Sequence, residues 1–102
     1  MKPKKSLRIN QTETEIRAAI KDYLQWTGWF VFYHLQGGIG VYPGLPDLEA
    51  VKDGQTVYIE VKTSTGRQRK DQIQFQADVE AHGGTYIVAR GIEDVEHLNQ
   101  KE

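Results

Sequence analysis

The stretch GLPDLEAVKDGQTVYIEVK, residues 44–62, contains two strand-like patterns on either side of an Asp-Gly dipeptide. Asp-Gly is a favoured pair for the two-residue type I′ turn of a β-hairpin. With that turn, the numbers of opposing residues sum to 107, so Leu48 faces Ile59 on an apolar side. A slip of one residue would mix the two faces, which supports this register. The stretch therefore predicts an antiparallel hairpin with strands at 46–52 and 55–62.

The same register places charged residues where a small protein would prefer apolar or neutral ones. Asp47 faces Glu60, and Lys62 lies diagonally across from Asp47 on the same side. Opposed carboxylates on a sheet repel each other, by up to about 1 kcal/mol. Two interpretations are open. Lys62 neutralises the acids in a surface salt bridge at a solvated strand end, or the acids hold a divalent cation such as Mg²⁺ together with waters and phosphate.

Two further residues favour the metal site. Lys62 follows Glu60 after one intervening residue, where it could stabilise charge developing on a phosphate or help to position and deprotonate a water. Gln72 falls in line with Phe75 and Val79 at helical spacing, so a polar amide occupies the core-facing stripe of a predicted helix. Gln72 is interpreted as pointing at the end of the hairpin, towards phosphate, water or Lys62. The alternative is one glutamine of several, placed there by chance.

Composition limits the classes of protein to which the chain could belong. Its 102 residues, of which 38% are hydrophobic, suit one domain with a single core. It has no cysteine, which excludes disulfides and thiolate metal sites. No apolar run reaches the length of a membrane span, and MKPKKSLRIN lacks the apolar segment of a signal peptide. We therefore expect a soluble protein inside the cell.

Local charge is more informative than the net charge of −1. Residues 1–11 form a basic arm that we expect to be flexible, either a solvated tail or a phosphate-contacting segment. A second basic cluster follows the hairpin closely. Its candidate phosphate-contacting residues are Arg67, Arg69 and Lys70.

The remaining pattern predicts helices and strands in the order α-β-β-β-α-β-α. A helix begins after Thr12, which forms a capping box with Glu15, and ends at Gly28. A strand at 29–33 and a glycine-rich loop at 34–44 lead to the hairpin. A helix at 69–82, a strand at 85–89 and a short helix from 92 to about 100 follow it. The predicted fold class is α/β, with one mixed sheet flanked by helices in a single domain at 12–102.

At this point the motifs resemble a known family. Gly44-Leu45-Pro46-Asp47, twelve further residues and then Glu60-Val61-Lys62 resemble the PD-(D/E)XK nuclease motif. Glu15, Gly-Trp at 28–29, Gly-Arg at 66–67 before Gln72, and Gly84 resemble the VRR-NUC branch, the virus-type replication-repair nucleases, in a minimal stand-alone form. The similarity runs from about residue 14 to 89 and implies a restriction-endonuclease-like αβββαβ core.

The resemblance also implies roles for individual residues. Asp47 and Glu60 would ligate Mg²⁺ or Mn²⁺, with the Val61 carbonyl as a further ligand. Lys62 would be the catalytic lysine, and Gln72 the helix glutamine near the site. Glu15 would complete the acidic cluster directly or through water, in addition to its place in the capping box.

The activity implied is that of a Mg²⁺- or Mn²⁺-dependent deoxyribonuclease. A chain of this size has little surface for DNA, and the minimal stand-alone members resemble dimeric junction-resolving nucleases. We therefore expect a homodimer acting as a structure-selective endonuclease on branched or junction DNA. The alternative is a non-catalytic nucleic-acid-binding module on the same scaffold, although paired acids would repel DNA phosphates. A third hypothesis is a structural domain with a salt-bridged hairpin.

Overall fold

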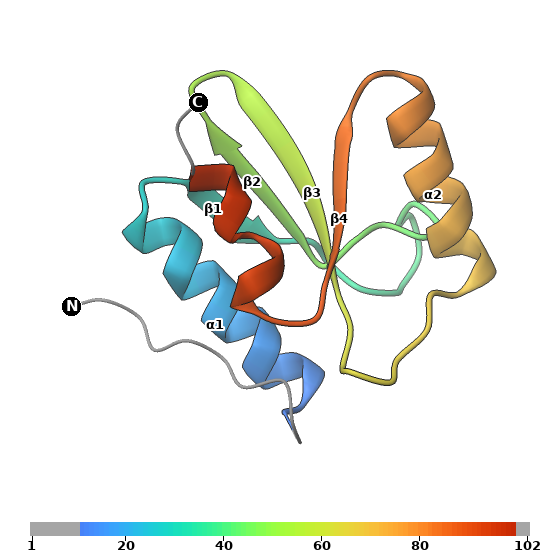
Figure 1. Ribbon diagram of the computed structural model, residues 1–102. Helices are drawn as coiled ribbons and strands as arrows, with labels where there is room; N and C mark the ends of the chain where they lie inside the picture. The colour runs from blue at the N-terminus through green and yellow to red at the C-terminus, as the bar shows by residue number, and fades with distance from the viewer. Residues whose placement is uncertain (1–10, 100–102) are drawn as a thin grey trace.

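Four strands form one mixed sheet with a helix on each face (Figure 1). The structure is a computed structural model and describes residues 11–99, so the predicted arm lies outside the described residues except for its last one. The sheet order is β1-β2-β3-β4, antiparallel except for the parallel β3–β4 pair. The elements are α1 (Glu13–Trp26), β1 (Phe30–Tyr33), β2 (Leu48–Lys52), β3 (Gln55–Val61), α2 (Lys70–Ala81), β4 (Thr85–Ala89) and the 3₁₀ turns η1 (Ile92–Asp94) and η2 (Glu96–Asn99). This confirms the αβββαβ core.

The predicted hairpin register is confirmed. Leu48 pairs with Ile59, and Lys52 pairs with Gln55 next to the turn. Both turn residues have positive φ, 51° at Asp53 and 78° at Gly54, as a type I′ turn requires. The alternation of apolar and polar residues along both strands therefore selects the pairing that buries the apolar face.

β2 is shorter than predicted, because it begins at Leu48 rather than at residue 46. The register would bring Pro46 opposite Val61, but the Pro46 carbonyl accepts hydrogen bonds from the side chains of His34 and Gln36 instead. The Val61 N–H donates to the Asp47 carboxylate, at 2.7 Å. Side-chain hydrogen bonds replace the ladder here, so the strand ends where the charged residues begin.

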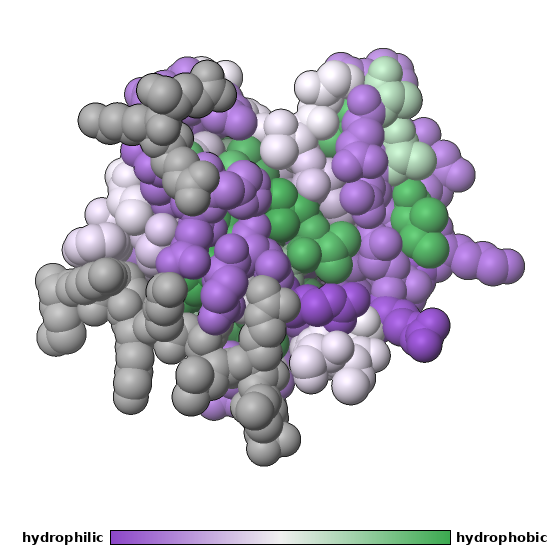
Figure 2. Space-filling view, in the orientation of Figure 1, coloured by the Kyte–Doolittle hydropathy of each residue, from purple (hydrophilic) through white to green (hydrophobic). Residues whose placement is uncertain are grey.

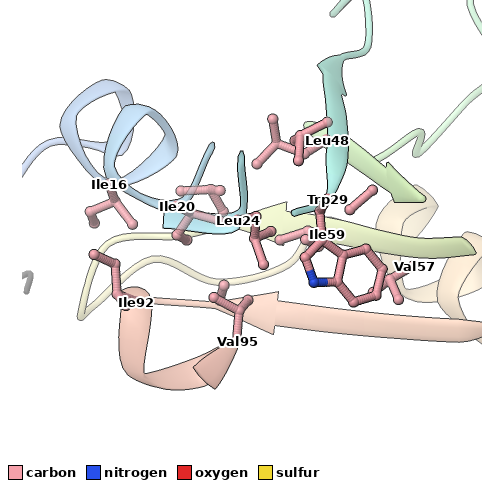
Figure 3. Close-up of a cluster of buried hydrophobic side chains, with 13 residues drawn as sticks. Ile16, Ile20, Leu24, Trp29, Leu48, Val57, Ile59, Ile92 and Val95 are labelled. Atoms are coloured by element: carbon pink, nitrogen blue, oxygen red, sulfur yellow. The ribbon is translucent and has the colours of Figure 1, made fainter. Parts of the chain in front are cut away.

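The main core lies between α1, one face of the sheet and the two 3₁₀ turns (Figure 3). The α1 stripe of Ile16, Ile20 and Leu24 is fully buried, as its helical spacing predicts. Thr12 and Glu15 form the predicted capping box, which fixes the start of the helix. The face that α1 covers carries the apolar residues of the hairpin.

The last helix is predicted incorrectly in type. Residues 92–99 form two 3₁₀ turns rather than an α-helix. Helices this short are marginal on their own, and here side chains set the path. Asp94 accepts from the Arg90 N–H at 2.8 Å, and Asn99 bonds the Trp29 indole at 3.0 Å and the Tyr23 hydroxyl at 3.2 Å.

The opposite face of the sheet is only partly covered. Phe75 of α2 packs against Tyr58 and Tyr86, with ring centroids 5.6 and 6.1 Å away. At the β1 edge, Phe30 is 66% exposed. Polar side chains dominate the face in Figure 2, with apolar ones visible between the α1 half and the α2 half. No helix in the described part of the chain is long and apolar enough to cross a membrane.

Candidate active site

Three charged side chains, Asp47, Glu60 and Lys62, lie close together at the end of the hairpin opposite the turn. Asp47 is 8% exposed, Lys62 6%, and Glu60 is fully buried. The Lys62 ammonium lies 3.7 Å from Glu60 Oε2. The predicted salt bridge between Lys62 and an acid is present, but it is buried and does not lie at a solvated strand end. Burying an ion costs several kcal/mol, so a group of buried ions at a strand end indicates a functional site.

Both carboxylate oxygens of Asp47 have partners. Oδ2 accepts the Val61 N–H, and Oδ1 pairs with Arg17 Nη1 of α1 at 3.2 Å. The first bond fixes the carboxylate to the backbone of β3. The second brings in a cation that sequence reasoning missed, since nothing in the local pattern of α1 distinguishes Arg17 from any other polar helix residue.

Glu60 is hydrogen-bonded through one carboxylate oxygen, while the other has only the Lys62 ammonium 3.7 Å away. Oε1 accepts from the Tyr86 hydroxyl at 2.6 Å and from Gln68 Nε2 at 3.0 Å. Burial, together with the hydrogen bond to Glu60, raises the pKa of Tyr86, so this phenol stays a donor. Oε2 is buried and accepts no hydrogen bond. Tyr86 and Gln68 were also missed: the pattern of 85–89 indicated only an apolar strand, and Gln68 was one of several glutamines.

These residues fit a hard divalent cation. A buried carboxylate oxygen without a hydrogen-bond donor is an orphaned acceptor, and Mg²⁺ takes carboxylate oxygens together with waters and substrate phosphates. Within residues 11–99, no group of three or more His, Cys, Asp or Glu side chains is arranged to hold a metal. Asp47 and Glu60 would therefore need water and substrate oxygens to complete the coordination of the ion.

Gln72 is buried, as predicted, but its carbonyl has a local partner. Its Oε1 accepts the Arg69 N–H at 2.8 Å, which satisfies a free donor at the start of α2. The glutamine that contacts Glu60 is Gln68. A role for Gln72 at the active site is still a prediction. Because its carbonyl oxygen bonds Arg69, its amide nitrogen would make the contact with phosphate or water.

Gly44 of the GLPD motif has a steric role. Its φ is +79°, and a Cβ at this position would lie 2.0 Å from the Asp71 carbonyl oxygen. The loop therefore passes directly over the first turn of α2, just before Pro46 and Asp47. A side chain here would push the chain away from that turn and displace Asp47.

The predicted basic cluster lies on the surface, in the loop and helix start that follow Lys62 in the sequence. Arg67, Arg69 and Lys70 are exposed, and Arg69 pairs with Asp71 at 3.3 Å. Arg90 fixes the intervening loop by donating to the carbonyls of Thr63 and Gly66. All three cations are exposed to solvent, but their role as DNA contacts stays a prediction.

Glu15 sits in the capping box. Its Oε1 accepts the Thr12 N–H at 3.0 Å, and that backbone bond, with the Thr12 hydroxyl, lowers the pKa of the carboxyl below 4.5. The structure does not bring Glu15 into a three-carboxylate group with Asp47 and Glu60. Its predicted part in metal binding is therefore a separate proposal from its capping role.

Glu15→Gln separates these two roles. Glutamine also completes a capping box, but it lacks the charge that favours a helix N-terminus. We expect the variant to fold with a slightly lower Tm at neutral pH. Because the folded pKa of Glu15 is lowered, this difference is present above pH 4.5 and disappears as the pH falls through the folded pKa. Thermal melts between pH 3 and 7 test this, and a Mn²⁺ response lost only in the variant would identify Glu15 as a ligand.

A solved structure described as a VRR_NUC domain matches with a TM-score of 0.71, over 84% of this chain and 91% of that chain, at 20% sequence identity. The chain has the VRR_NUC fold. The sequence itself matches no family model and no curated protein. The VRR_NUC likeness confirms the predicted fold, and the chemistry of the site depends on the residues described above.

Proposed function

We propose that this protein is a Mg²⁺- or Mn²⁺-dependent deoxyribonuclease of the VRR-NUC family. The observation that carries the proposal is the buried group of Asp47, Glu60 and Lys62, with Glu60 Oε2 lacking a hydrogen-bond donor. A domain selected only for stability would gain by replacing buried ions with apolar side chains. The VRR_NUC fold supports the same conclusion independently of these residues.

Each residue of the group would have a distinct part in phosphodiester hydrolysis. Asp47 and Glu60, with the Val61 carbonyl, would hold the metal. The bound ion would polarise the scissile phosphate and lower the pKa of a water. Tyr86 and Gln68 fix the Glu60 carboxylate, and the Val61 N–H fixes Asp47, so the ligands are oriented before substrate binds. Lys62 would assist the water or the charge that develops on the phosphate.

We further propose that the substrate is branched DNA and that the protein acts as a homodimer. Arg67, Arg69 and Lys70 would contact backbone phosphates, which is a sequence-independent and salt-sensitive interaction. The domain is small, and a two-fold pair of sites would let two copies cut opposed strands of one junction.

The decisive experiment is cleavage of labelled four-way junction, flap and linear duplex DNA with Mg²⁺, Mn²⁺ or EDTA. We expect cutting that requires metal, prefers branched DNA, and rises more than proportionally with protein concentration as dimers form. Light scattering over the same concentrations checks the dimer. A monomer whose specific activity is constant would refute the dimer alone. Metal-independent DNA binding without cutting would instead favour the non-catalytic scaffold.

A further inference from the structure

Two cations of α1 share an aromatic ring beside the candidate active site. Arg17 and Lys21 are one helical turn apart, so their side chains lie on the same face. The Arg17 guanidinium carbon is 5.6 Å and the Lys21 ammonium 4.7 Å from the centre of the Tyr33 ring. Tyr33 is nevertheless 46% exposed. The ring therefore orients both cations while it stays about half exposed to solvent.

Two of these residues, Arg17 and Tyr33, line a hollow that also contains Asp47, and Lys21 lies one helical turn beyond Arg17. The hollow has a volume of about 370 Å³, and Arg17, Tyr33, Leu35 and Asp47 are among its lining residues. Leu35 is 73% exposed. The lining thus combines a guanidinium, an aromatic ring, an exposed leucine and a proposed metal ligand. A nucleotide offers the complementary groups, a phosphate and an apolar ring face.

We propose that the hollow between α1 and the end of β1 is a nucleotide subsite for the DNA strand next to the scissile phosphate. Lys21 and Arg17 contact backbone phosphates, and Tyr33 packs against a sugar or base. The proposal rests on the proposed function and extends it, because the basic residues singled out from the sequence lie after β3, whereas these cations lie on α1.

Arg17 has a second property in this scheme. Its guanidinium pairs with Asp47 Oδ1, yet its side chain is 28% exposed. A divalent cation on Asp47 and the guanidinium repel each other, so metal binding favours release of Arg17 from the carboxylate. A phosphate in the hollow gives the released guanidinium a new partner. Arg17 therefore leaves the Asp47 carboxylate when metal binds and pairs with a substrate phosphate instead.

Lys21→Gln tests the phosphate contact without touching Asp47. Fluorescence anisotropy with labelled branched DNA in EDTA, at several salt concentrations, measures binding without cutting. We expect the negative slope of log K against log salt to decrease in magnitude by about one relative to the wild type. Lys52→Gln is the charge-matched control. Lys52 lies beside the turn, at the other end of β2, and bonds the Thr27 carbonyl, so its loss should not change the slope. A wild-type slope in Lys21→Gln overturns the subsite.

Arg17→Gln tests the exchange. With Mn²⁺ alone, we expect the concentration that gives half the thermal shift to fall about fivefold, because a competing cation is gone. Binding of a non-hydrolysable analogue of the same DNA in Mn²⁺ should weaken, because the metal releases the wild-type guanidinium to the phosphate. A side chain with only a structural role would weaken both, and an unchanged or higher Mn²⁺ midpoint overturns the exchange. If the wild type shows no Mn²⁺ shift and no cutting, the proposed function fails; if it shows both while these variants match it, only the subsite fails.

Discussion

Lys62→Met is expected to reduce metal-dependent cleavage by about 10²–10³-fold, the usual effect of removing one preorganised charge from a reacting phosphate or oxyanion. Methionine keeps most of the buried stem and removes only the ammonium. The Lys62 side chain is 8% exposed and its ammonium lies 3.7 Å from Glu60 Oε2, so the charge that is removed is buried beside a proposed metal ligand. Single-turnover cleavage of branched DNA measures the effect.

The same variant should respond more strongly to metal. Without the ammonium, Glu60 is a buried acid whose Oε2 has neither a donor nor a cation. The metal-free variant should therefore be less stable than the wild type, and bound Mn²⁺ should restore more stability than it adds to the wild type. Cleavage within tenfold of the wild-type rate would contradict the catalytic role. Lost cleavage together with a lost Mn²⁺ shift would indicate that Lys62 only maintains the site.

The residues that sequence reasoning identified at the site are those set by local rules. Asp47, Glu60 and Lys62 belong to one hairpin, so a turn dipeptide and an alternating pattern were enough to bring them together. Their burial was not predictable in the same way. It depends on α1, α2 and β4 closing over the end of the hairpin, which no pattern within the stretch records.

The missed residues reach the site from distant parts of the chain. Arg17 is 30 residues from Asp47 in the sequence, and Tyr86 is 26 residues from Glu60. Tyr86 arrives through the parallel β3–β4 pairing, where Tyr58 aligns with it and Glu60 with Val88. A parallel register has no turn to fix it, so the sequence alone leaves the neighbours of Glu60 undetermined.

The glutamines around the start of α2 show that the end of a helix can decide which hydrogen bond a side chain makes, even where helical spacing predicts its burial. Gln72 occupies the third position of α2, where a Glu or Gln side chain can fold back to the N-cap amide. Its carbonyl does so. Gln68 precedes the helix and is free of that constraint, and it reaches Glu60. Burial was predicted from helical spacing, but the hydrogen-bond partner was decided by the end of the helix.

Asp47→Asn should abolish the stabilisation that Mn²⁺ gives. At a Mn²⁺ concentration of about 100 times Kd, the wild type should gain roughly 2.7 kcal/mol, or roughly 10–20 °C in Tm for a domain of this size. The amide oxygen of asparagine can still accept the Val61 N–H, so the fold should persist. Its amide nitrogen then faces Arg17 and no longer pairs with it, which should lower the stability of the metal-free protein by about 1 kcal/mol.

Glu49→Gln is the matched control, because it makes the same chemical change two residues further along. Glu49 is partly buried and pairs with His34 Nε2 at 2.9 Å, not with Lys62 or Arg17. We expect this variant to keep the full Mn²⁺ shift, measured by differential scanning fluorimetry with Mg²⁺ and EDTA in parallel. If Asp47→Asn kept the shift and Glu49→Gln lost it, the cation would bind between β1 and β2 and the proposed ligand pair would be wrong. If both kept it, the cation would bind elsewhere, and the buried pair of acids would need another explanation.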